Sequence, residues 1–527
     1  MFVPLTPLEF RDRAEALYAR KIGVIDGDKQ FTYQEFGERT HKLANALRAL
    51  GMEKGDRASF LTYNTHQLLE AYFGVVEAGG ILNPINIRLT PQDIAYILNH
   101  SASKFLFFHQ DFCPLVKAMM PALSATKYLV VMEGPCDEPA THEYEQLLAS
   151  AGPEYVKPTV DENEIAELFY TSGTTGKPKG VAITHRSLYL HALNTAIAMH
   201  LFDSDVILHI VPLFHVNGWG TPQTLTMMGG THVMLRKFEP VTCLTLVQKH
   251  KVTRMFGVPT MFNMMLNHPD LSKFDLSSVE NIMLGGAPSA PALVKAIQEK
   301  FGCRAIVGYG LTETTPVVTL AWPKAHLKGE SPEQKLARQA MTGYSLPGVD
   351  VRVVDANGND VKADGTQIGE IVVHSNIVMD GYYKEPDATR NAIRDGWFHT
   401  GDMAVRDEEG YVLIKDRSKD IIISGGENIS SVEIENCLYA NPKVFEAAVV
   451  SAPDEKWGEV PRALVVLKPG QTATEQEIID FCKANLAGFK VPKSVEFRDA
   501  LPKGGTGKIL KADLREPFWK GQEKRVH

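Results

Sequence analysis

The chain has 527 residues, with 55 Lys and Arg against 63 Asp and Glu, a formal net charge of −8, and 44% hydrophobic residues. This length suggests about two to four domains, and the composition is globular, which excludes a disordered, collagen-like or coiled-coil chain. Because the chain is net negative and has no basic block, we expect no nucleic-acid partner.

The first half of the chain alternates helix patterns with short β-rich runs. Thr32 and Glu35 have the spacing of a capping box, and Thr90 opens a second helix. Between such helices lie apolar runs such as 104–108 and 128–132. This alternation predicts a layered α/β architecture with largely parallel sheets.

Residues 206–235 are thirty residues without Asp, Glu, Lys or Arg, which is long enough for a membrane-spanning helix. Pro212 and Gly218 interrupt any such helix, however, and the polar residues His209 and Asn217 would need partners in lipid. We therefore predict a buried sheet and helix here, and no transmembrane segment.

The pattern changes in the second half. Runs 351–355 and 369–374, separated by a turn rich in Gly and Asp, predict antiparallel strands in a small β-barrel-like subdomain. The charged run 416–420 then separates apolar segments, and we place the domain boundary there. The prediction is a large domain of residues 1–416, followed by a small, mobile α+β domain of residues 417–527.

Six cysteines are far apart in the sequence and form no CxxC pair. This spacing argues against a zinc ribbon and against a disulfide framework, and it fits a reducing compartment. The first residues lack a cationic segment followed by an apolar run, and the last residues are neither a prenylation box nor a peroxisomal signal. We expect a cytoplasmic protein.

The strongest local signal is YTSGTTGKPKGV at 170–181, a glycine-rich loop with many hydroxyls and lysines. Backbone amides, hydroxyls and the Lys179 ammonium would suit a triphosphate. The loop is not a Walker A motif, because Pro178 follows Lys177 and the glycine spacing is too short. The alternative is a flexible polar surface loop. The phosphate candidates are Thr171, Ser172, Gly173, Thr174, Thr175, Gly176 and Lys179.

A second cluster is GYGLTET at 308–314. Tyr309 offers a flat face for a base, Gly310 permits close approach, and Thr312 can bind a phosphate oxygen. Glu313 supplies a hard oxygen ligand for Mg²⁺. Taken alone, Thr-Glu after a strand is equally typical of a helix start.

With these clusters the chain resembles the adenylate-forming superfamily, which contains acyl-CoA synthetases, luciferases and the adenylation domains of peptide synthetases. Several of its motifs are weak alone, but their shared order over the whole chain is highly specific. The motifs are YTSGTTGKPKGV at 170–181, PLFHVNG at 212–218, GGAP at 285–288, GYGLTET at 308–314, GWFHTGDM at 396–403, KDRSKDIIISGGENI at 415–429 and LPKGGTGKIL at 501–510.

The resemblance implies an ATP site. The glycine-rich loop would hold the phosphates, Thr312 and Glu313 a phosphate and Mg²⁺, and Lys508 would bridge the substrate carboxylate and the α-phosphate during adenylation. For Lys508 the alternative is an ordinary solvated lysine. The implied adenine contacts are Gly286, Ala287 and Tyr309, and the implied ribose contacts are Asp402 and Arg417.

The resemblance also implies two half-reactions with different arrangements of the domains. Lys419 matches the family's hinge position, and the alternative is that 416–420 is a passive charged linker. After a swing, Gly425 and Gly426 would approach the pantetheine arm of coenzyme A. Lys493 matches, more loosely, a surface that receives the CoA nucleotide.

The prediction of the acid substrate depends on the residues expected to line its pocket. His215 stands where amino-acid-activating relatives have an Asp, which disfavours an ammonium-bearing substrate. Gly310 stands where acetyl-activating relatives have a Trp, so Gly308 and Gly310 would leave the acyl pocket open. Trp219 resembles an aromatic residue that gates the acyl tunnel of fatty acyl-CoA synthetases, although a Trp beside glycines is more often a core residue.

The resulting prediction is an ATP-dependent acyl-CoA synthetase for a medium- or long-chain fatty acid, acting through an acyl-adenylate and releasing AMP and pyrophosphate. Its partners would be a small carboxylic acid, ATP and CoA, and a homodimer is allowed. The alternatives are an aryl or other acid–CoA ligase, a stand-alone adenylation enzyme that loads a separate carrier protein, a luciferase-type oxygenase and a non-catalytic nucleotide-binding regulator.

Overall fold

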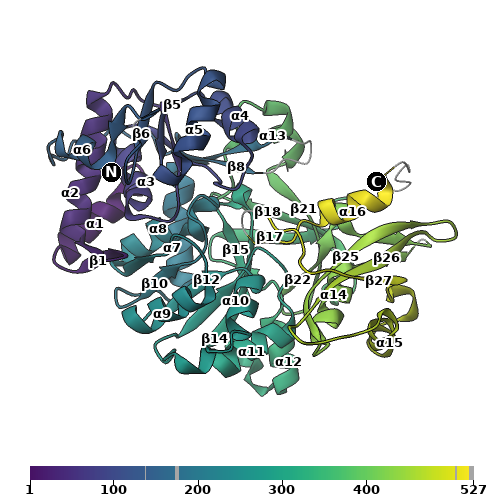
Figure 1. The fold of residues 1–527 in the computed structure, drawn as a ribbon. Coiled ribbons are helices and arrows are strands. Elements are labelled where there is room, and N and C mark those ends of the chain that lie inside the picture. The colour runs from purple at the N-terminus through teal and green to yellow at the C-terminus, as the bar shows by residue number, and fades with distance from the viewer. Residues whose placement is uncertain (137, 172–176, 426, 505–506, 521–527) are drawn as a thin grey trace.

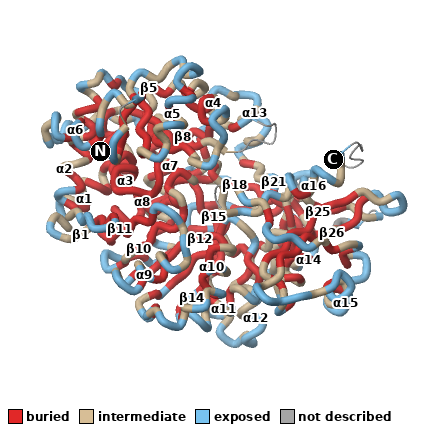
Figure 2. Tube along the Cα trace, viewed as in Figure 1, coloured by how far each residue is buried: buried red, intermediate tan, exposed pale blue. Residues whose placement is uncertain are grey.

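The structure is a computed structural model that describes residues 1–136, 138–171, 177–425, 427–504 and 507–520 (Figure 1). Following the predicted boundary, we call residues 1–416 the large domain and residues 417–527 the C-terminal domain. The C-terminal domain lies to one side of the large domain (Figure 1). Buried residues fill the interior of both (Figure 2).

Two sheets form most of the large domain, with nine and eight strands among the described residues. The nine-stranded sheet has the order β16-β15-β14-β13-β12-β10-β11-β1-β2, formed by β1 (Ile22–Asp26), β2 (Lys29–Thr32), β10 (Val206–His209), β11 (Thr231–Met234), β12 (Arg254–Gly257), β13 (Asn281–Leu284), β14 (Arg304–Gly310), β15 (Val317–Leu320) and β16 (Tyr344–Ser345). The eight-stranded sheet has the order β19-β9-β8-β4-β3-β5-β6-β7, formed by β3 (Arg57–Leu61), β4 (Ile81–Pro84), β5 (Ser103–Phe108), β6 (Tyr128–Val131), β7 (His142–Glu143), β8 (Ile165–Thr171), β9 (Lys179–Thr184) and β19 (Gly381–Tyr382). Strands β10 to β14 and β3 to β6 pair in parallel.

Helices cover these sheets, and α3 packs against both β4 and β1, so it lies between the two sheets. The helices of the large domain are α1 (Leu8–Tyr18), α2 (Tyr33–Ala49), α3 (His66–Glu77), α4 (Pro91–Ser101), α5 (Cys113–Met119), α6 (Tyr144–Ala149), α7 (His185–Met199), α8 (Val216–Met228), α9 (Pro240–His250), α10 (Pro259–Leu266), α11 (Pro291–Phe301), α12 (Pro332–Gln339) and α13 (Pro386–Ala392). The layered α/β prediction with largely parallel sheets is confirmed.

The predicted local signals start helices where they were expected. Thr32 is the N-cap of α2, where its hydroxyl accepts a hydrogen bond from the Glu35 N–H at 3.2 Å and its own N–H donates to the Glu35 carboxylate at 2.7 Å. Thr90 is the N-cap of α4, where its hydroxyl accepts a hydrogen bond from the Asp93 N–H. Such caps satisfy amides at a helix start that have no partner within the helix.

The uncharged segment 206–235 forms β10, α8 and β11 in the buried core. Among the described residues no helix combines the length and the apolar character needed to cross a bilayer. The prediction of a buried sheet and helix is therefore confirmed.

Antiparallel strands follow the two large sheets, as predicted. They form a five-stranded sheet among the described residues, with β17 (Val349–Val354), β18 (Gly369–Ser375), β20 (Ile393–Arg394), β21 (Trp397–Arg406) and β22 (Val412–Arg417). Strand β22 ends at Arg417, so this sheet leads directly into the predicted hinge.

The C-terminal domain has its own sheet and its own hydrophobic core. Its elements are β23 (Ile422–Ser424), β24 (Glu427–Ile429), β25 (Val444–Asp454), β26 (Gly458–Leu467), β27 (Ser494–Phe497), α14 (Ser431–Ala440), α15 (Glu475–Asn485) and α16 (Lys511–Trp519). The α+β class predicted for this segment is confirmed, and the boundary at residue 416 stays a prediction.

The cysteine prediction is wrong at one pair. Cys113 at the start of α5 forms a disulfide with Cys136, and their Cα atoms are 6.2 Å apart. Their separation of 23 residues carries no motif. The parallel pairing of β5 and β6, which precede these two cysteines, brings them together, so the sequence spacing alone does not reveal the bond.

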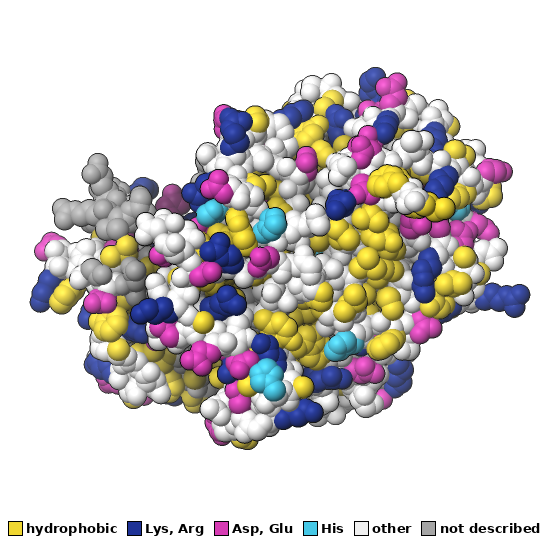
Figure 3. Space-filling view, turned by 180° about the vertical axis from the view of Figure 1, so that it is seen from behind, with side chains coloured by type: hydrophobic (Ala, Val, Ile, Leu, Met, Phe, Trp, Pro, Cys, Tyr) yellow, Lys and Arg dark blue, Asp and Glu magenta, His cyan; other side chains and the backbone are white. Residues whose placement is uncertain are grey.

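Charges of both signs are mixed on the face of the molecule shown in Figure 3. Hydrophobic side chains gather toward the middle of this face (Figure 3). The mixture agrees with the overall balance of 55 basic and 63 acidic residues.

Candidate active site

Three of the predicted site residues meet at one carboxylate. Asp402 on β21 and Arg417 at the end of β22 are paired across antiparallel strands. Arg417 Nε lies 3.1 Å from Asp402 Oδ1. The Tyr309 hydroxyl donates to Asp402 Oδ2 at 2.7 Å. Asp402 is only 4% exposed, so its carboxylate is largely shielded from water, whereas the Arg417 side chain remains partly exposed.

Glu313 and Lys179 are linked by a residue that the motifs did not identify. The hydroxyl of Tyr382 donates to Glu313 Oε1 at 2.9 Å, and Lys179 Nζ lies 5.1 Å from the centroid of the Tyr382 ring. Loss of hydration within the protein raises the pKa of the Glu313 carboxyl, and the Tyr382 hydrogen bond opposes that shift. In the sequence, the Gly-Tyr-Tyr run at 381–383 was the only local sign of Tyr382. This run is too short to show strand or helix periodicity, so it did not identify Tyr382 as a site residue.

Lys508 approaches this cluster from the C-terminal domain. Its side chain keeps exposed surface, but surrounding protein atoms crowd it. This crowding, together with the Arg417 cation, lowers the pKa of Lys508 to about 8. The pKa of His215 is lowered to about 4 by burial and by the charge of Lys508. Lys508 therefore lies close enough to interact electrostatically with both Arg417 and His215.

Hydrogen bonds between the domains hold the turn around Lys508. Thr260 Oγ1 donates to the carbonyl of Gly507 at 3.2 Å, and Arg88 Nη1 donates to the carbonyl of Gly504 at 3.2 Å. These contacts place the C-terminal domain in the arrangement that presents Lys508 to the large domain.

The predicted hinge is held by α16. Residues Ser418–Asp420 form a short 3₁₀ helix. Arg515 Nη1 donates to the carbonyl of Lys419 at 3.1 Å and to Asp420 Oδ1 at 2.6 Å. On the other side, Asp416 Oδ2 accepts from the backbone N–H of Ser431 at 2.8 Å. Sequence reasoning missed Arg515, because its contact depends on how α16 folds back.

The two arms of the glycine-rich loop are side by side. Thr171 ends β8 and is paired with Lys179 at the start of β9. The loop residues Ser172, Gly173, Thr174, Thr175 and Gly176, and also Gly426, lie outside the described residues. Their phosphate and pantetheine roles stay predictions.

The adenine candidates follow β13. Gly286 has φ +74°, in the region that favours glycine, and Ala287 beside it is half-buried. Thr312, on the opposite motif, is buried at 7% exposure. These positions keep the predicted adenine and phosphate contacts on the same side of the large domain as Tyr309, at the ends of adjacent strands β13 and β14.

The two CoA candidates with described positions are separate from the Asp402 cluster. The Gly425 N–H donates to the Trp457 carbonyl at 2.8 Å, and the exposed Lys493 donates its N–H to Pro461 at 2.9 Å. Within the described residues, no hydrogen bond or ion pair joins either one to Asp402 or Arg417. Their roles stay predictions.

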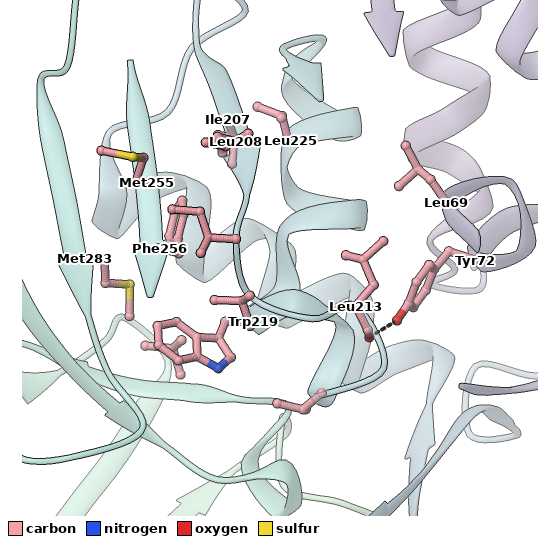
Figure 4. Packing of buried hydrophobic residues seen from close by; sticks show 14 of the residues in the cluster. Leu69, Tyr72, Ile207, Leu208, Leu213, Trp219, Leu225, Met255, Phe256 and Met283 are labelled. Atoms are coloured by element: carbon pink, nitrogen blue, oxygen red, sulfur yellow. Dashed lines mark hydrogen bonds between the residues drawn. The ribbon is translucent and has the colours of Figure 1, made fainter. Parts of the chain in front are cut away.

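Neighbouring atoms fill the direction in which Gly308 and Gly310 would carry a side chain, and the open acyl pocket predicted there stays a prediction. A Cβ atom at Gly310 would overlap the backbone carbonyl of Pro316, and one at Gly308 would overlap the end of the Met283 side chain. Both glycines are therefore needed for close packing in that direction. Trp219 is 5% exposed and lies against the same core, close to Met283 (Figure 4).

Cavities of about 590 Å³ and about 390 Å³ are present elsewhere in the large domain. None of the predicted site residues lines either of them. The larger is a groove between α1, α7 and α8, lined by residues such as Phe10 and Met227.

The close packing at Gly310 yields a prediction for Gly310→Ala. The added methyl group overlaps backbone, which cannot move aside as a flexible side chain does. We therefore expect the free energy of unfolding to fall by about 1–3 kcal/mol or more. Gly329→Ala is the matched control, because a Cβ there meets nothing within 4 Å, and we expect a change within about 0.5 kcal/mol. Thermal unfolding of both variants measures the difference. Equal midpoints would contradict the assignment of Gly310 to packing.

Among the described residues one group of potential metal ligands contains three side chains, namely Asp26, His66 and Glu133. Arg236 already lies 2.5 Å from Glu133 and 3.6 Å from Asp26, so a guanidinium compensates both carboxylates. We assign no metal to this group. Glu313 remains the candidate Mg²⁺ ligand, and substrate phosphates would have to supply most of the other oxygen ligands.

Comparison with known proteins identifies relatives over the whole chain. The family model described as AMP-binding enzyme matches residues 10–383, and the model described as AMP-binding enzyme C-terminal domain matches residues 433–508. A long-chain-fatty-acid–CoA ligase of Thermus thermophilus is 41% identical, with 97% of this chain and 95% of the relative covered. A 2-methylpropanoate–CoA ligase of Humulus lupulus is 39% identical, with 97% and 95% covered.

Solved structures have the same fold. The crystal structure of the anthranilate CoA ligase AuaEII in complex with anthranoyl-AMP superposes with a TM-score of 0.90 at 27% identity, and 98% of each chain is covered. The three similar proteins are named for a long-chain, a short branched and an aromatic acid.

Proposed function

Because the chain belongs to the AMP-binding enzyme family, whose similar members include acid–thiol ligases, we propose that it is an ATP-dependent acyl-CoA synthetase. It joins a carboxylic acid to CoA through an acyl-adenylate and releases AMP and pyrophosphate. The observation that carries this proposal is the polar cluster of Asp402, Arg417 and Tyr309, together with Lys508, which interacts electrostatically with Arg417 and Asp402.

The first half-reaction requires two anions to meet. A carboxylate oxygen attacks the α-phosphorus of ATP, the bond to the β-phosphate oxygen breaks, and pyrophosphate leaves. The Lys508 ammonium stabilises the negative charge that develops between the substrate carboxylate and the α-phosphate. Asp402, which contacts Arg417 and Tyr309, would accept hydrogen bonds from the ribose hydroxyls.

Mg²⁺ fits this site as an oxygen-bound cation. Glu313 offers a carboxylate that Tyr382 orients, and the Thr312 hydroxyl is next to it in the chain. When bound, the ion would neutralise negative charge on the phosphates. Lys179, whose ammonium lies over the Tyr382 ring, would add a second positive charge for the same phosphates.

The second half-reaction needs Lys508 out of the way. The thiol of CoA attacks the acyl carbon, the thioester bond forms, and AMP leaves with the electrons of the broken acyl–phosphate bond. A thiol ionises far more readily than a hydroxyl, so no protein base is assigned. We infer that rotation at Lys419 removes Lys508 and brings Gly425 to the site.

We propose a medium- or long-chain fatty acid as the substrate. The 41% identity to the Thermus thermophilus ligase supports this choice, and so does His215 where an ammonium-binding Asp would otherwise stand. An aromatic acid is the second candidate, because the anthranilate ligase has the same fold at a TM-score of 0.90.

The test is AMP formation from ATP and CoA with straight-chain acids of increasing length and with benzoates. We expect AMP release that requires both an acid and CoA, with the highest kcat/KM for acids longer than butyrate. Acid-dependent pyrophosphate exchange without CoA transfer would indicate loading of a separate carrier. Absence of any acid-dependent AMP or exchange would contradict the proposal.

The lowered pKa of Lys508 predicts a pH dependence. Its folded pKa is about 8, below the ordinary lysine value of 10.5. The ammonium is therefore present below pH 8 and lost as the pH rises through it. We expect kcat/KM for ATP, measured by pyrophosphate exchange, to fall by about tenfold per pH unit above that point, because kcat/KM reports ionisations of the free enzyme.

Lys508→Arg is the control for this pH profile, because arginine stays charged throughout the range. Each profile is normalised to its own plateau. We expect the fall above pH 8 to disappear in the variant. The same fall in both proteins would assign the titration to a different group.

Three finer points belong to the same proposal. We propose Mg²⁺ as the metal, a homodimer as an allowed assembly, and the cytoplasm as the location. Metal dependence of pyrophosphate exchange, the mass in solution and the distribution of a tagged full-length chain in cells test these three points.

A further inference from the structure

The segment that carries Trp219 has an unusual backbone. At the start of α8 five consecutive residues have positive φ: Val216 +32°, Asn217 +41°, Gly218 +52°, Trp219 +63° and Gly220 +86°. Three of them have side chains, and one of these is β-branched, so their conformation is strained. We call residues 216–220 the left-handed turn. Such strain persists only where neighbouring groups hold it, and it is typical of functional sites.

Asn217 holds the turn from inside. Its Oδ1 accepts a hydrogen bond from the Gly220 N–H at 2.7 Å, which closes the turn. Its Nδ2 donates to Glu167 Oε2 at 3.3 Å. One turn later on α8, Gln223 Nε2 donates to Glu167 Oε1 at 2.5 Å. The carboxylate of Glu167 therefore receives one amide on each oxygen, and both amides come from the beginning of α8.

Glu167 is an unusual residue to find at this position. It lies on β8 with no exposed surface, and burial raises its pKa to about 8 against the effect of the two amides. Among the described residues no cation forms an ion pair with it, and Tyr72 is the other titratable group that interacts with it. An unpaired buried carboxyl is costly to the fold. Its retention at the centre of the large domain therefore calls for a role other than stability.

The turn determines where the indole of Trp219 lies. A Cβ atom on Gly285 would lie 3.0 Å from Trp219 Cη2, and one on Gly286 would lie 3.4 Å from Cζ2. The indole therefore packs against the loop after β13 that contains the adenine candidates, beside Met283 (Figure 4). His215, a candidate for the acid pocket, directly precedes the turn.

We propose that Glu167, acting through Asn217 and Gln223, holds the left-handed turn and so fixes the Trp219 indole, which makes these buried residues determinants of the acid chain length that the enzyme accepts. They are positioning residues, because they act through Trp219. The inference rests on the proposed acyl-CoA synthetase function and deepens it.

The experiment compares two variants with a control in the full-length protein. Glu167→Gln keeps the size but replaces one accepting oxygen with an NH₂ group that cannot accept an amide hydrogen bond. Asn217→Gly deletes the side chain and tolerates the positive φ, so it separates the side-chain link from the backbone. Thr226→Val is the control, because Thr226 is also buried on α8 but its hydroxyl bonds His232 at 3.1 Å.

The measurements are kcat/KM for acetate, butyrate, octanoate and dodecanoate, KM for ATP, and thermal unfolding. For the two acids that the wild type separates most strongly, we expect the ratio of kcat/KM to fall about tenfold in Glu167→Gln and in Asn217→Gly. KM for ATP should stay unchanged. The control should keep the wild-type ratio, whatever its thermal midpoint, because a merely structural loss does not change discrimination between acids.

Each outcome decides the proposal. An unchanged ratio in both variants overturns it, and so does an equal change in Thr226→Val. If the ratio of kcat/KM changes in Glu167→Gln but not in Asn217→Gly, Glu167 does not act through Asn217, and this part of the proposal is overturned. If Glu167→Gln does not fold, Asn217→Gly decides. A wild type that activates acids without discriminating among them overturns this inference alone, whereas a wild type that activates none overturns the proposed function as well.

Discussion

Replacing Lys508 with alanine is expected to abolish most acid-dependent pyrophosphate exchange while leaving thioester formation from a supplied acyl-adenylate largely intact. In the proposed mechanism Lys508 supplies the cation for adenylation, and hydrogen bonds from Thr260 and Arg88 hold its turn against the large domain. Loss of one preorganised charge of this kind typically costs on the order of a hundred- to a thousandfold in rate. In the proposed mechanism, the second half-reaction uses a different arrangement of the domains, in which Lys508 lies away from the site.

Two separate assays measure this split. The first follows exchange of labelled pyrophosphate into ATP, and the second follows CoA thioester formation from synthetic acyl-adenylate. Lys483→Ala is the matched control, because Lys483 is an exposed lysine on α15 of the same domain. It should leave both rates unchanged. Equal damage to both half-reactions in Lys508→Ala would refute its assignment to adenylation.

Replacing Lys419 with proline is expected to have the opposite pattern. Proline holds φ near −65° and also restricts the residue before it, so the dihedral change that a domain rotation needs is blocked. The carbonyl of residue 419 remains available to Arg515, whose donor is 3.1 Å away. The variant should therefore keep the arrangement seen here, in which Lys508 faces the large domain.

Pyrophosphate exchange should survive in this variant, while transfer to CoA should fall at least about tenfold, which corresponds to about 1.4 kcal/mol on the barrier. Lys419→Ala is the control, because it removes the same side chain and leaves the backbone free to rotate. If residues 416–420 are a passive linker, both substitutions should change stability by no more than about 0.5 kcal/mol and affect the two steps alike. Undiminished CoA transfer in a folded Lys419→Pro variant would falsify the hinge assignment.

Local patterning was sufficient to predict the architecture. The capping residues Thr32 and Thr90 start helices at the expected positions, and the runs 104–108 and 128–132 are β5 and β6. These signals act between residues a few positions apart, so they can be read without knowing the fold. The order of the motifs was sufficient for the family in the same way, because each motif is one continuous segment of chain.

The candidate site was only partly predictable. Asp402, Arg417 and Tyr309 were named one by one from separate motifs, and the structure joins them within hydrogen-bond distance. Tyr382 and Arg515 were missed. Each acts through a partner far away in the sequence, Glu313 for the first and Asp420 for the second, and neither belongs to a segment with a recognisable pattern.

The acid pocket shows most clearly where sequence reasoning ends. Gly310 was interpreted as empty space because a family position with a large side chain is a glycine here. In the fold, the backbone at Pro316 takes up that space. A glycine specifies that no side chain is present, but it does not specify what fills the volume instead. That volume is filled by segments that approach only when β14 and β15 pair, so packing of the whole domain decides it.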